Sequence, residues 1–148
     1  MEEVILFWGP DNPYPEFSNF HPSPFILDGL KWETVEHYFQ AQKATSNHQR
    51  EMIRLARTPD IAKRFGRECE LRKDWNEVKV DVMFNACIAK YQQNPDLLKI
   101  LLDTGNAVLH EDSPYDFIWG WRSRQGDQGL DLLGKVLMRV RKELRDGG

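Results

Sequence analysis

Residues 32–43 read WETVEHYFQAQK, and the periodicity of the chain changes within this segment. Two short apolar runs ending at its first residue flank Asp28-Gly29, a pair that is typical of a two-residue hairpin turn. Apolar residues then recur at helical spacing, and Thr34 is a capping residue, which together indicate a helix to about Thr45. The two apolar runs are Phe25–Leu27 and Leu30–Trp32. The sequence therefore predicts a hairpin that leads directly into a helix.

Three polar residues of this helix, Glu36, Gln40 and Lys43, have the spacing i, i+4 and i+7 and so lie along one face. They place a carboxylate, an amide and an amine in a row, beside the rings of Tyr38 and Phe39. Such a row is a candidate catalytic site. The same spacing is also typical of the solvated stripe of an ordinary amphipathic helix. The spacing by itself does not separate the two interpretations.

The rest of the chain predicts a helix-rich α+β fold with a small β-sheet, in a single domain over residues 1–148. The other expected elements are strands at 4–7 and 107–110, a loop at 11–24, helices at 48–57, from 58 onward, at 74–93, 95–103 and 130–145, and a loop at 111–129. Asp74 is expected to cap the helix at 74–93, because aspartate is a favoured N-cap residue.

The composition fits an ordinary globular protein, with 148 residues of which 41% are hydrophobic and 29% charged. The chain has no apolar run of about 18 residues and no recognisable leader, so we expect a cytoplasmic protein that does not contact a membrane. Cys69 and Cys87 form no CxxC pattern. We expect them to be reduced thiols of the core.

Charge is distributed unevenly along the chain. The net charge is −6 over residues 1–42, +4 over residues 43–79 and −1 over residues 80–148. The overall balance excludes a protein built mainly to grip nucleic acid. The positive central segment can attract a phosphorylated ligand, and it also fits a solvated helical surface.

Common metal and nucleotide motifs do not occur in the sequence. The histidines show no HExxH or paired spacing, and there is no G-x-S-x-G, Walker or G-x-G-x-x-G pattern. We therefore expect neither a metal site nor a cofactor. Trp119 follows Asp116 and precedes Gly120 in an expected loop, where its ring can stack on a base or a sugar.

Four segments occur together in one order along the chain. They are Phe17–Phe20 (FSNF), Trp32–Lys43 (WETVEHYFQAQK), Asp116–Gly120 (DFIWG) after Glu111, and Leu133–Arg141 (LGKVLMRVR). In this order they resemble the NADAR family, also called the YbiA-like N-glycosidases. The stretch EHYFQAQK at Glu36–Lys43 is long and specific, and the likeness extends from about Ile5 to about Leu144.

The resemblance implies a compact α+β fold that acts without a metal or a cofactor. It implies hydrolysis of the bond between a base nitrogen and the C1 carbon of ribose. Two substrate classes are associated with the family. One is ADP-ribose attached to guanine in DNA or RNA, or a related ADP-ribose compound, and the other is an early phosphoribosylamino-pyrimidine intermediate of riboflavin biosynthesis. The expected partner is therefore an ADP-ribose or ribose-phosphate substrate.

The resemblance also indicates the site residues. Glu36 is the candidate for stabilising positive charge at C1 and for activating water. Two roles are open for Lys43. As an ammonium it binds phosphate or protonates the leaving base, and as a free amine, which requires a lowered pKa, it forms a Schiff base with the opened ribose. The expected substrate-binding residues are Asn19, Gln40, Glu111 and Asp116 for ribose hydroxyls, Trp119 for ring stacking, and Phe20, Trp32, Tyr38, Gly120 and Asp131.

Three residues depart from the family pattern. Asp131 stands where asparagine is usual, and Trp121 and Arg122 stand where small glycines are usual. We expect these changes to alter substrate preference. An alternative function is a non-catalytic module that recognises ADP-ribose or a nucleotide. Such a module does not need Glu36 and Lys43 together, so their joint presence favours an enzyme.

Overall fold

The computed structural model describes residues 3–9, 13–113, 116, 118–121 and 129–147. Its contacts divide the chain into two compact units, one of Met1–Ser18 with Pro95–Gly148 and one of Asn19–Asn94. Within the described residues, no helix is long and apolar enough to cross a membrane. The expectation of a single domain over residues 1–148 stays a prediction.

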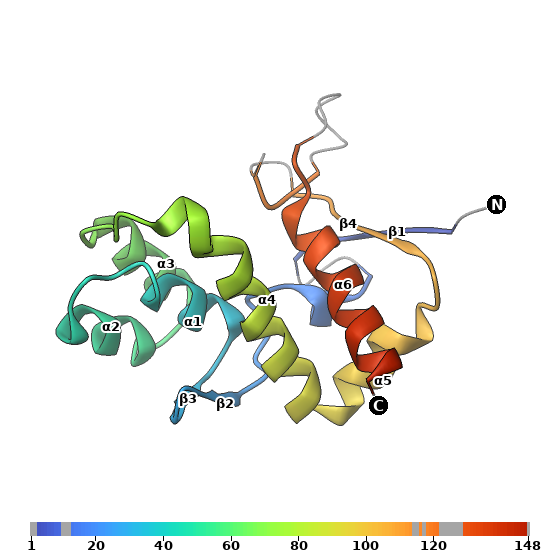
Figure 1. Ribbon diagram of the computed structural model, residues 1–148, viewed down its shortest axis with the longest axis horizontal. Helices are drawn as coiled ribbons and strands as arrows, with labels where there is room; N and C mark the ends of the chain where they lie inside the picture. Colours follow the sequence, from blue (N-terminus) through green and yellow to red (C-terminus); the bar gives the residue numbers. More distant parts are fainter. Residues whose placement is uncertain (1–2, 10–12, 114–115, 117, 122–128, 148) are drawn as a thin grey trace. The chain divides into compact units, whose positions relative to one another are not determined.

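The unit Asn19–Asn94 contains the predicted hairpin, drawn in blue in Figure 1. Its strands β2 (Phe25–Leu27) and β3 (Leu30–Trp32) pair in antiparallel fashion. Asp28 and Gly29 form the turn with φ values of 56° and 78°. Two successive positive φ values match the twist of a type I′ hairpin, and glycine adopts the second without steric cost.

Helix α1 (Val35–Ala41) follows the hairpin, and Thr34 caps it as predicted, because its hydroxyl accepts a hydrogen bond from the His37 N–H at 3.1 Å. All seven residues of α1 are buried, since the helix contacts α2, α3, α4 and β3. Helix α1 ends at Ala41, before the predicted end at about Thr45. The chain turns there, and the carbonyl of Lys43 accepts a hydrogen bond from the N–H of Arg72 at 2.9 Å.

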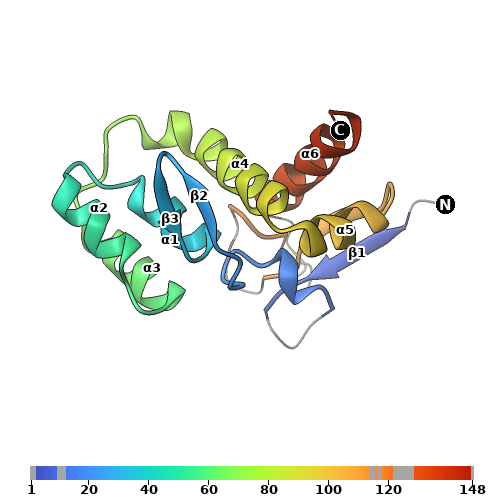
Figure 2. The same cartoon turned by 90° about the horizontal axis from the view of Figure 1, so that it is seen from below.

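Three further helices complete this unit, and Figure 2 shows α2 and α3 lying beside α1. They are α2 (Asn47–Arg54), α3 (Pro59–Glu68) and α4 (Trp75–Gln93). Ser46 and Thr58 cap α2 and α3 with their side-chain oxygens. Asp74 is the N-cap residue of α4, as predicted, but its side chain makes no capping hydrogen bond. The Asp74 carboxylate pairs instead with Arg72, whose Nε lies 2.6 Å from Oδ1, and a charged guanidinium is the stronger partner.

The second unit is built on a parallel pair of strands that α6 covers. Its elements are β1 (Val4–Phe7), the 3-10 turn η1 (Pro15–Phe17), α5 (Pro95–Asp103), β4 (Val108–Glu111) and α6 (Leu132–Asp146). Val4 pairs with Val108 in the strand register. Helix α6 approaches β4 closely because of Gly134, where a Cβ atom would overlap the carbonyl oxygen of Leu109.

The predicted fold class is confirmed. The described residues form six helices and two two-stranded sheets, which is a helix-rich α+β arrangement. The predicted apolar stripe of α6 is buried from Leu133 to Val140, whereas Leu144 near the end of the helix is only half-buried. The two strand pairs belong one to each unit.

Candidate active site

Glu36 and Gln40 form a hydrogen-bonded pair inside the unit Asn19–Asn94. The Nε2 atom of Gln40 donates to Glu36 Oε2 at 2.6 Å, and the two residues are only 3% and 6% exposed, in that order. Both come from α1, where the i, i+4 spacing brings the side chains together. This face of α1 is therefore not a solvated stripe, and its carboxylate lies in the interior of the unit.

The start of α1 fixes the backbone at Glu36. The N–H of Glu36 donates to the carbonyl oxygen of Asn19 at 3.0 Å, which ties the segment around Asn19 and Phe20 to the helix. Glu36 also lies in the first helical turn, where the helix dipole favours a negative charge. The structure thus joins the backbone of Asn19, a predicted binding residue, to the backbone of Glu36.

Lys43 lies just beyond α1 in an aromatic environment. Its Nζ is 5.5 Å from the ring centre of Phe39 and 5.8 Å from that of Trp75, and the two rings pack edge to face. Burial lowers the pKa of Lys43 below its ordinary value, and the negative charge of Glu36 opposes this shift. The pKa of Lys43 is lowered on balance, so a larger fraction of Lys43 is the free amine than for an exposed lysine.

Two cations of α3 add to the positive field around Lys43. Arg67 and Lys63 both lower the pKa of Lys43 further, as like charges do. Lys63 Nζ also lies 5.8 Å from the ring centre of Phe20, a predicted binding residue. The sequence indicated only a basic segment. The i, i+4 spacing of Lys63 and Arg67 is the signal that identifies these two residues.

Trp32 and Tyr38, both predicted to bind substrate, hold the hairpin against α1. The indole Nε1 of Trp32 donates to the carbonyl oxygen of Leu27 at 3.0 Å, and the hydroxyl of Tyr38 donates to Asp28 Oδ2 at 2.8 Å. Their rings pack edge to face at 4.9 Å. Burial raises the pKa of Tyr38, and the hydrogen bond to Asp28 raises it further. The structure thus gives both side chains packing partners, and substrate contact by them stays a prediction.

A second group of predicted residues lies in the other unit, after β4. Asp116 Oδ1 accepts hydrogen bonds from the N–H groups of Ile118 and Trp119, at 2.8 and 2.9 Å, so this carboxylate shapes its own loop. Gly120 is buried, and a Cβ atom there would lie 2.7 Å from the carbonyl oxygen of Asp116 and 3.3 Å from that of Glu111. The tight turn therefore requires glycine, and Gly120 lies beside Glu111 at the end of β4.

Asp131 lies at the start of α6 and pairs with a residue that the sequence did not indicate. Its Oδ2 is 2.6 Å from His110 Nδ1, and its Oδ1 accepts the N–H of Glu111 at 3.3 Å. The His110 ring stacks on Trp121 at 4.0 Å with an interplanar angle of 16°. Two of the family departures, Asp131 and Trp121, thus meet in one cluster, while Arg122 lies outside the described residues. The sequence pattern of the strand that contains His110 did not identify this residue as part of a site.

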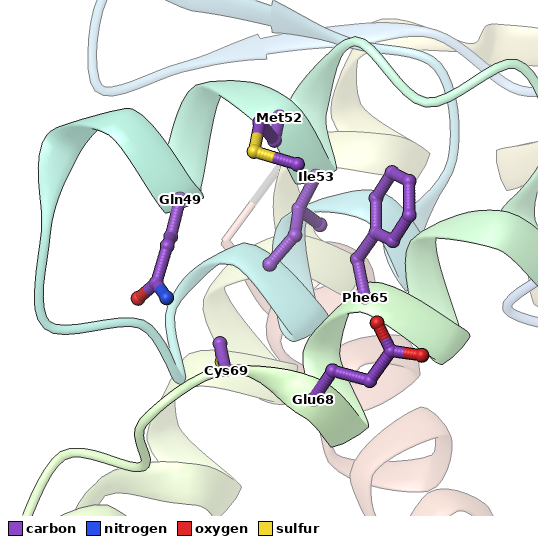
Figure 3. Close-up of a pocket in the computed structure, with 6 residues that line it drawn as sticks. All are labelled: Gln49, Met52, Ile53, Phe65, Glu68 and Cys69. Carbon is purple, nitrogen blue, oxygen red and sulfur yellow. The ribbon is translucent and has the colours of Figure 1, made fainter.

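A pocket of about 210 Å³ opens between α2 and α3 (Figure 3). It is lined by Gln49, Met52, Ile53, Phe65, Glu68 and Cys69. None of the predicted site residues lines it. Cys69 lies within electrostatic range of Lys43, and each affects the pKa of the other. Burial raises the pKa of Cys69, so the thiol form is favoured. Within the described ranges, no three His, Cys, Asp or Glu residues lie close enough to hold a metal ion.

Comparison with known proteins shows close relatives over the whole length of the chain. Residues 6–145 match the NADAR domain. The N-glycosidase Npun_R5314 of Nostoc punctiforme is 40% identical over 149 residues, which cover 97% of this chain and 94% of that protein. The N-glycosidase YbiA of Escherichia coli is 40% identical over 97% of this chain and 90% of that protein. The chloroplastic riboflavin biosynthesis protein PYRR of Zea mays is 37% identical over 95% of this chain, which spans 25% of that protein.

Comparison with a solved structure gives the same family as comparison of the sequences. The NMR structure of the E. coli protein YbiA matches this chain with a TM-score of 0.90 and 39% identity, over 99% of this chain and 88% of that one. The family likeness therefore covers both the sequence and the fold. The chain belongs to the NADAR domain family.

Proposed function

We propose that the protein is an N-glycosidase that hydrolyses the bond between a base nitrogen and C1 of a phosphorylated ribose. Two of its relatives carry the name N-glycosidase, and another is a riboflavin biosynthesis protein. The observation that carries the proposal is the buried Glu36 carboxylate, hydrogen-bonded by Gln40 and within the electrostatic reach of Lys43. A carboxylate can act as a general base, and an amine of lowered pKa can act as a nucleophile toward an opened sugar.

Glu36 stabilises the positive charge that develops at C1 as the base departs. A carboxylate in a partly desolvated site acts more strongly on such a charge than one in water. Glu36 also accepts a proton from the attacking water. Its burial in α1 supports both roles, because the helix holds the carboxylate in one position.

Lys43 acts as an amine. In the ring-opened sugar the base is attached to C1 as an imine, and Lys43 Nζ adds to this carbon. The base then leaves with a proton, and water hydrolyses the lysine imine to release the ribose aldehyde and the free amine. The lowered pKa of Lys43 supports this route over a purely cationic role.

The substrate carries a phosphate close to the ribose. Lys63 and Arg67 supply the positive field that a phosphate requires. Phe20 lies beside Lys63, and the backbone of Asn19 is hydrogen-bonded to the backbone of Glu36. We propose two substrate classes, ADP-ribosyl guanine and phosphoribosylamino-pyrimidines of the riboflavin pathway. Glu111, Asp116 and Trp119 contribute further contacts to the sugar or base in this proposal.

A side-by-side assay tests the proposal. The protein is incubated with ADP-ribosylated DNA and, separately, with a phosphoribosylamino-pyrimidine, and the released base and ribose phosphate are measured by mass spectrometry. We expect turnover of at least one substrate and little turnover by the Glu36→Gln variant. Tight binding of ADP-ribose without release of any base would instead identify a non-catalytic binding module.

A further inference from the structure

The side-chain amide of Gln40 has one orientation that fits its surroundings. Its Nε2 atom donates to Glu36 Oε2 at 2.6 Å. Turning the amide over would bring Oε1 against the carboxylate, and an ionised carboxylate has no proton to donate. The hydrogen bond to Glu36 therefore determines which end of the amide faces the carboxylate.

The opposite end of this amide lies against Gly66 of α3. A Cβ atom on Gly66 would overlap Gln40 Oε1 and would lie 2.9 Å from Cδ and 3.0 Å from Cβ of the same side chain. Gly66 lies inside a regular helix and has no positive φ, so the backbone does not require glycine there. Glycine is among the least favourable residues in a helix interior. What requires glycine at this position is the space that the Gln40 amide occupies.

Both ends of the Gln40 amide lie against protein atoms, Nε2 against Glu36 and Oε1 against Gly66. The residue is buried, and its Oε1 has no hydrogen-bond donor among the residues that the structure describes. The sequence suggested that Gln40 orients a ribose hydroxyl. The geometry favours an indirect role, in which the amide affects the reaction through Glu36.

We infer that Gln40 is a positioning residue that aims the Glu36 carboxylate, and that Gly66 is the residue of α3 that holds the Gln40 amide in place. The inference rests on the proposed function, in which Glu36 acts at C1. Catalytic groups lose much of their effect when they move by about 1 Å. A methyl group at position 66 would push the amide away from Glu36 without changing any residue proposed to touch substrate.

A double-mutant cycle tests this arrangement. In Gly66→Ala and in Gln40→Ala, kcat should fall about 10- to 100-fold, the effect of losing a hydrogen bond to a charged group, while KM changes by less than about twofold. The double variant should be no slower than Gln40→Ala, because the vacated space accepts the new methyl group. For the same reason its Tm should exceed that of Gly66→Ala.

A control variant separates positioning from simple loss of stability. Ala62 lies one turn before Gly66 on the same buried face of α3. Ala62→Gly should lower Tm through helix propensity and leave kcat unchanged. An equal loss of kcat in Ala62→Gly would overturn the inference. So would wild-type kcat in a folded Gly66→Ala protein, or losses that multiply in the double variant.

A measurement without substrate distinguishes failure of this inference from failure of the proposed function. The side-chain amide protons of Gln40 should exchange slowly with solvent in the wild type. The ¹⁵N resonance of this amide should shift in both Glu36→Ala and Gly66→Ala. An unchanged resonance in Gly66→Ala would contradict the inference. If the wild type hydrolyses neither substrate class but these shifts occur, the proposed function fails and the Gly66–Gln40–Glu36 arrangement stands.

Discussion

Helix α1 and the junction between β4 and α6 each bury a carboxylate, and they use it differently. Glu36 lies within a regular helix and accepts a hydrogen bond from the neutral amide of Gln40. Asp131 lies just outside a helix at a φ of 54° and pairs with the His110 ring and the N–H of Glu111. The first carboxylate is held by a neighbour on its own helix, whereas the second ties the start of α6 to the end of β4.

Under the proposed function, the difference separates a carboxylate that acts at C1 from one that links two elements. Removing the charge of Glu36 alters its hydrogen bond with Gln40 within α1, so the main effect should be on turnover. Removing the charge of Asp131 alters the link between β4 and α6, so an effect on stability should accompany any change in substrate preference. The predictions below test this contrast.

The largest effect is expected at Lys43, which shares the environment of Glu36. Borohydride added during turnover should reduce the imine and leave a stable adduct on the peptide that contains Lys43, detectable by mass spectrometry. Lys43→Ala and Lys43→Arg should both lose more than about 10³-fold in kcat, because neither provides a nucleophilic amine. Omitting the substrate is the control, and it should give no adduct. Residual activity in Lys43→Arg alone would favour a cationic role, and an adduct on another lysine would exclude this assignment.

Glu36→Gln should lower kcat by about 10²–10³, as expected for the loss of one electrostatic stabiliser. Its Tm should stay close to that of the wild type, because glutamine has nearly the same shape and the helix contacts remain. Steady-state kinetics and a thermal melt measure the two quantities together. Near-wild-type turnover in a folded Glu36→Gln variant would remove Glu36 from the mechanism and with it the contrast to Asp131.

Local sequence signals predicted the region around Glu36 well. Asp28-Gly29 fits the two positive φ values of the turn, and Thr34 caps α1, so both features depend on residues adjacent in sequence. The side chains of Glu36 and Gln40 meet because of helical spacing alone. The sequence did not predict that this face is buried, because periodicity does not reveal which elements pack against a helix.

Contacts between distant residues account for what the sequence did not predict. Gly66 has a defined role only because Gln40, from another helix, occupies the space beside it. His110 gave no signal because its partner Asp131 is 21 residues away. Asp74 occupies the predicted N-cap position but makes no side-chain capping bond for a related reason, since propensity rules do not include competition from Arg72.

At the β4–α6 junction, Gly134→Ala should destabilise the fold by about 1–3 kcal/mol, the usual effect of overpacking. The added Cβ would overlap the carbonyl oxygen of Leu109 and lie 2.6 Å from Asp131 Oδ1. Thermal or urea unfolding measures the loss. Lys135→Ala, at the exposed neighbouring position, is the control and should change stability by less than about 0.5 kcal/mol. A Gly134→Ala protein as stable as the wild type would show that α6 can move away from β4 freely.

The smallest effect is expected for Asp131→Asn, and it should depend on pH. Burial raises the pKa of Asp131, and the hydrogen bond with His110 only partly offsets the increase. A carboxyl group whose pKa is raised by folding contributes stability below its ordinary value of about 3.9, and this contribution is lost as the pH rises through the raised value.

Asparagine does not titrate. The Tm of Asp131→Asn relative to the wild type should therefore increase as the pH rises from about 4 through the raised pKa of Asp131, and then stay constant, with a total change below about 4 °C. Leu130→Ala is the control because it removes no titratable group, and its Tm difference from the wild type should not vary with pH. A difference for Asp131→Asn that falls as the pH rises would mean that the pair with His110 outweighs burial. The junction carboxylate would then be stabilised by its charge, and the contrast with Glu36 would no longer hold.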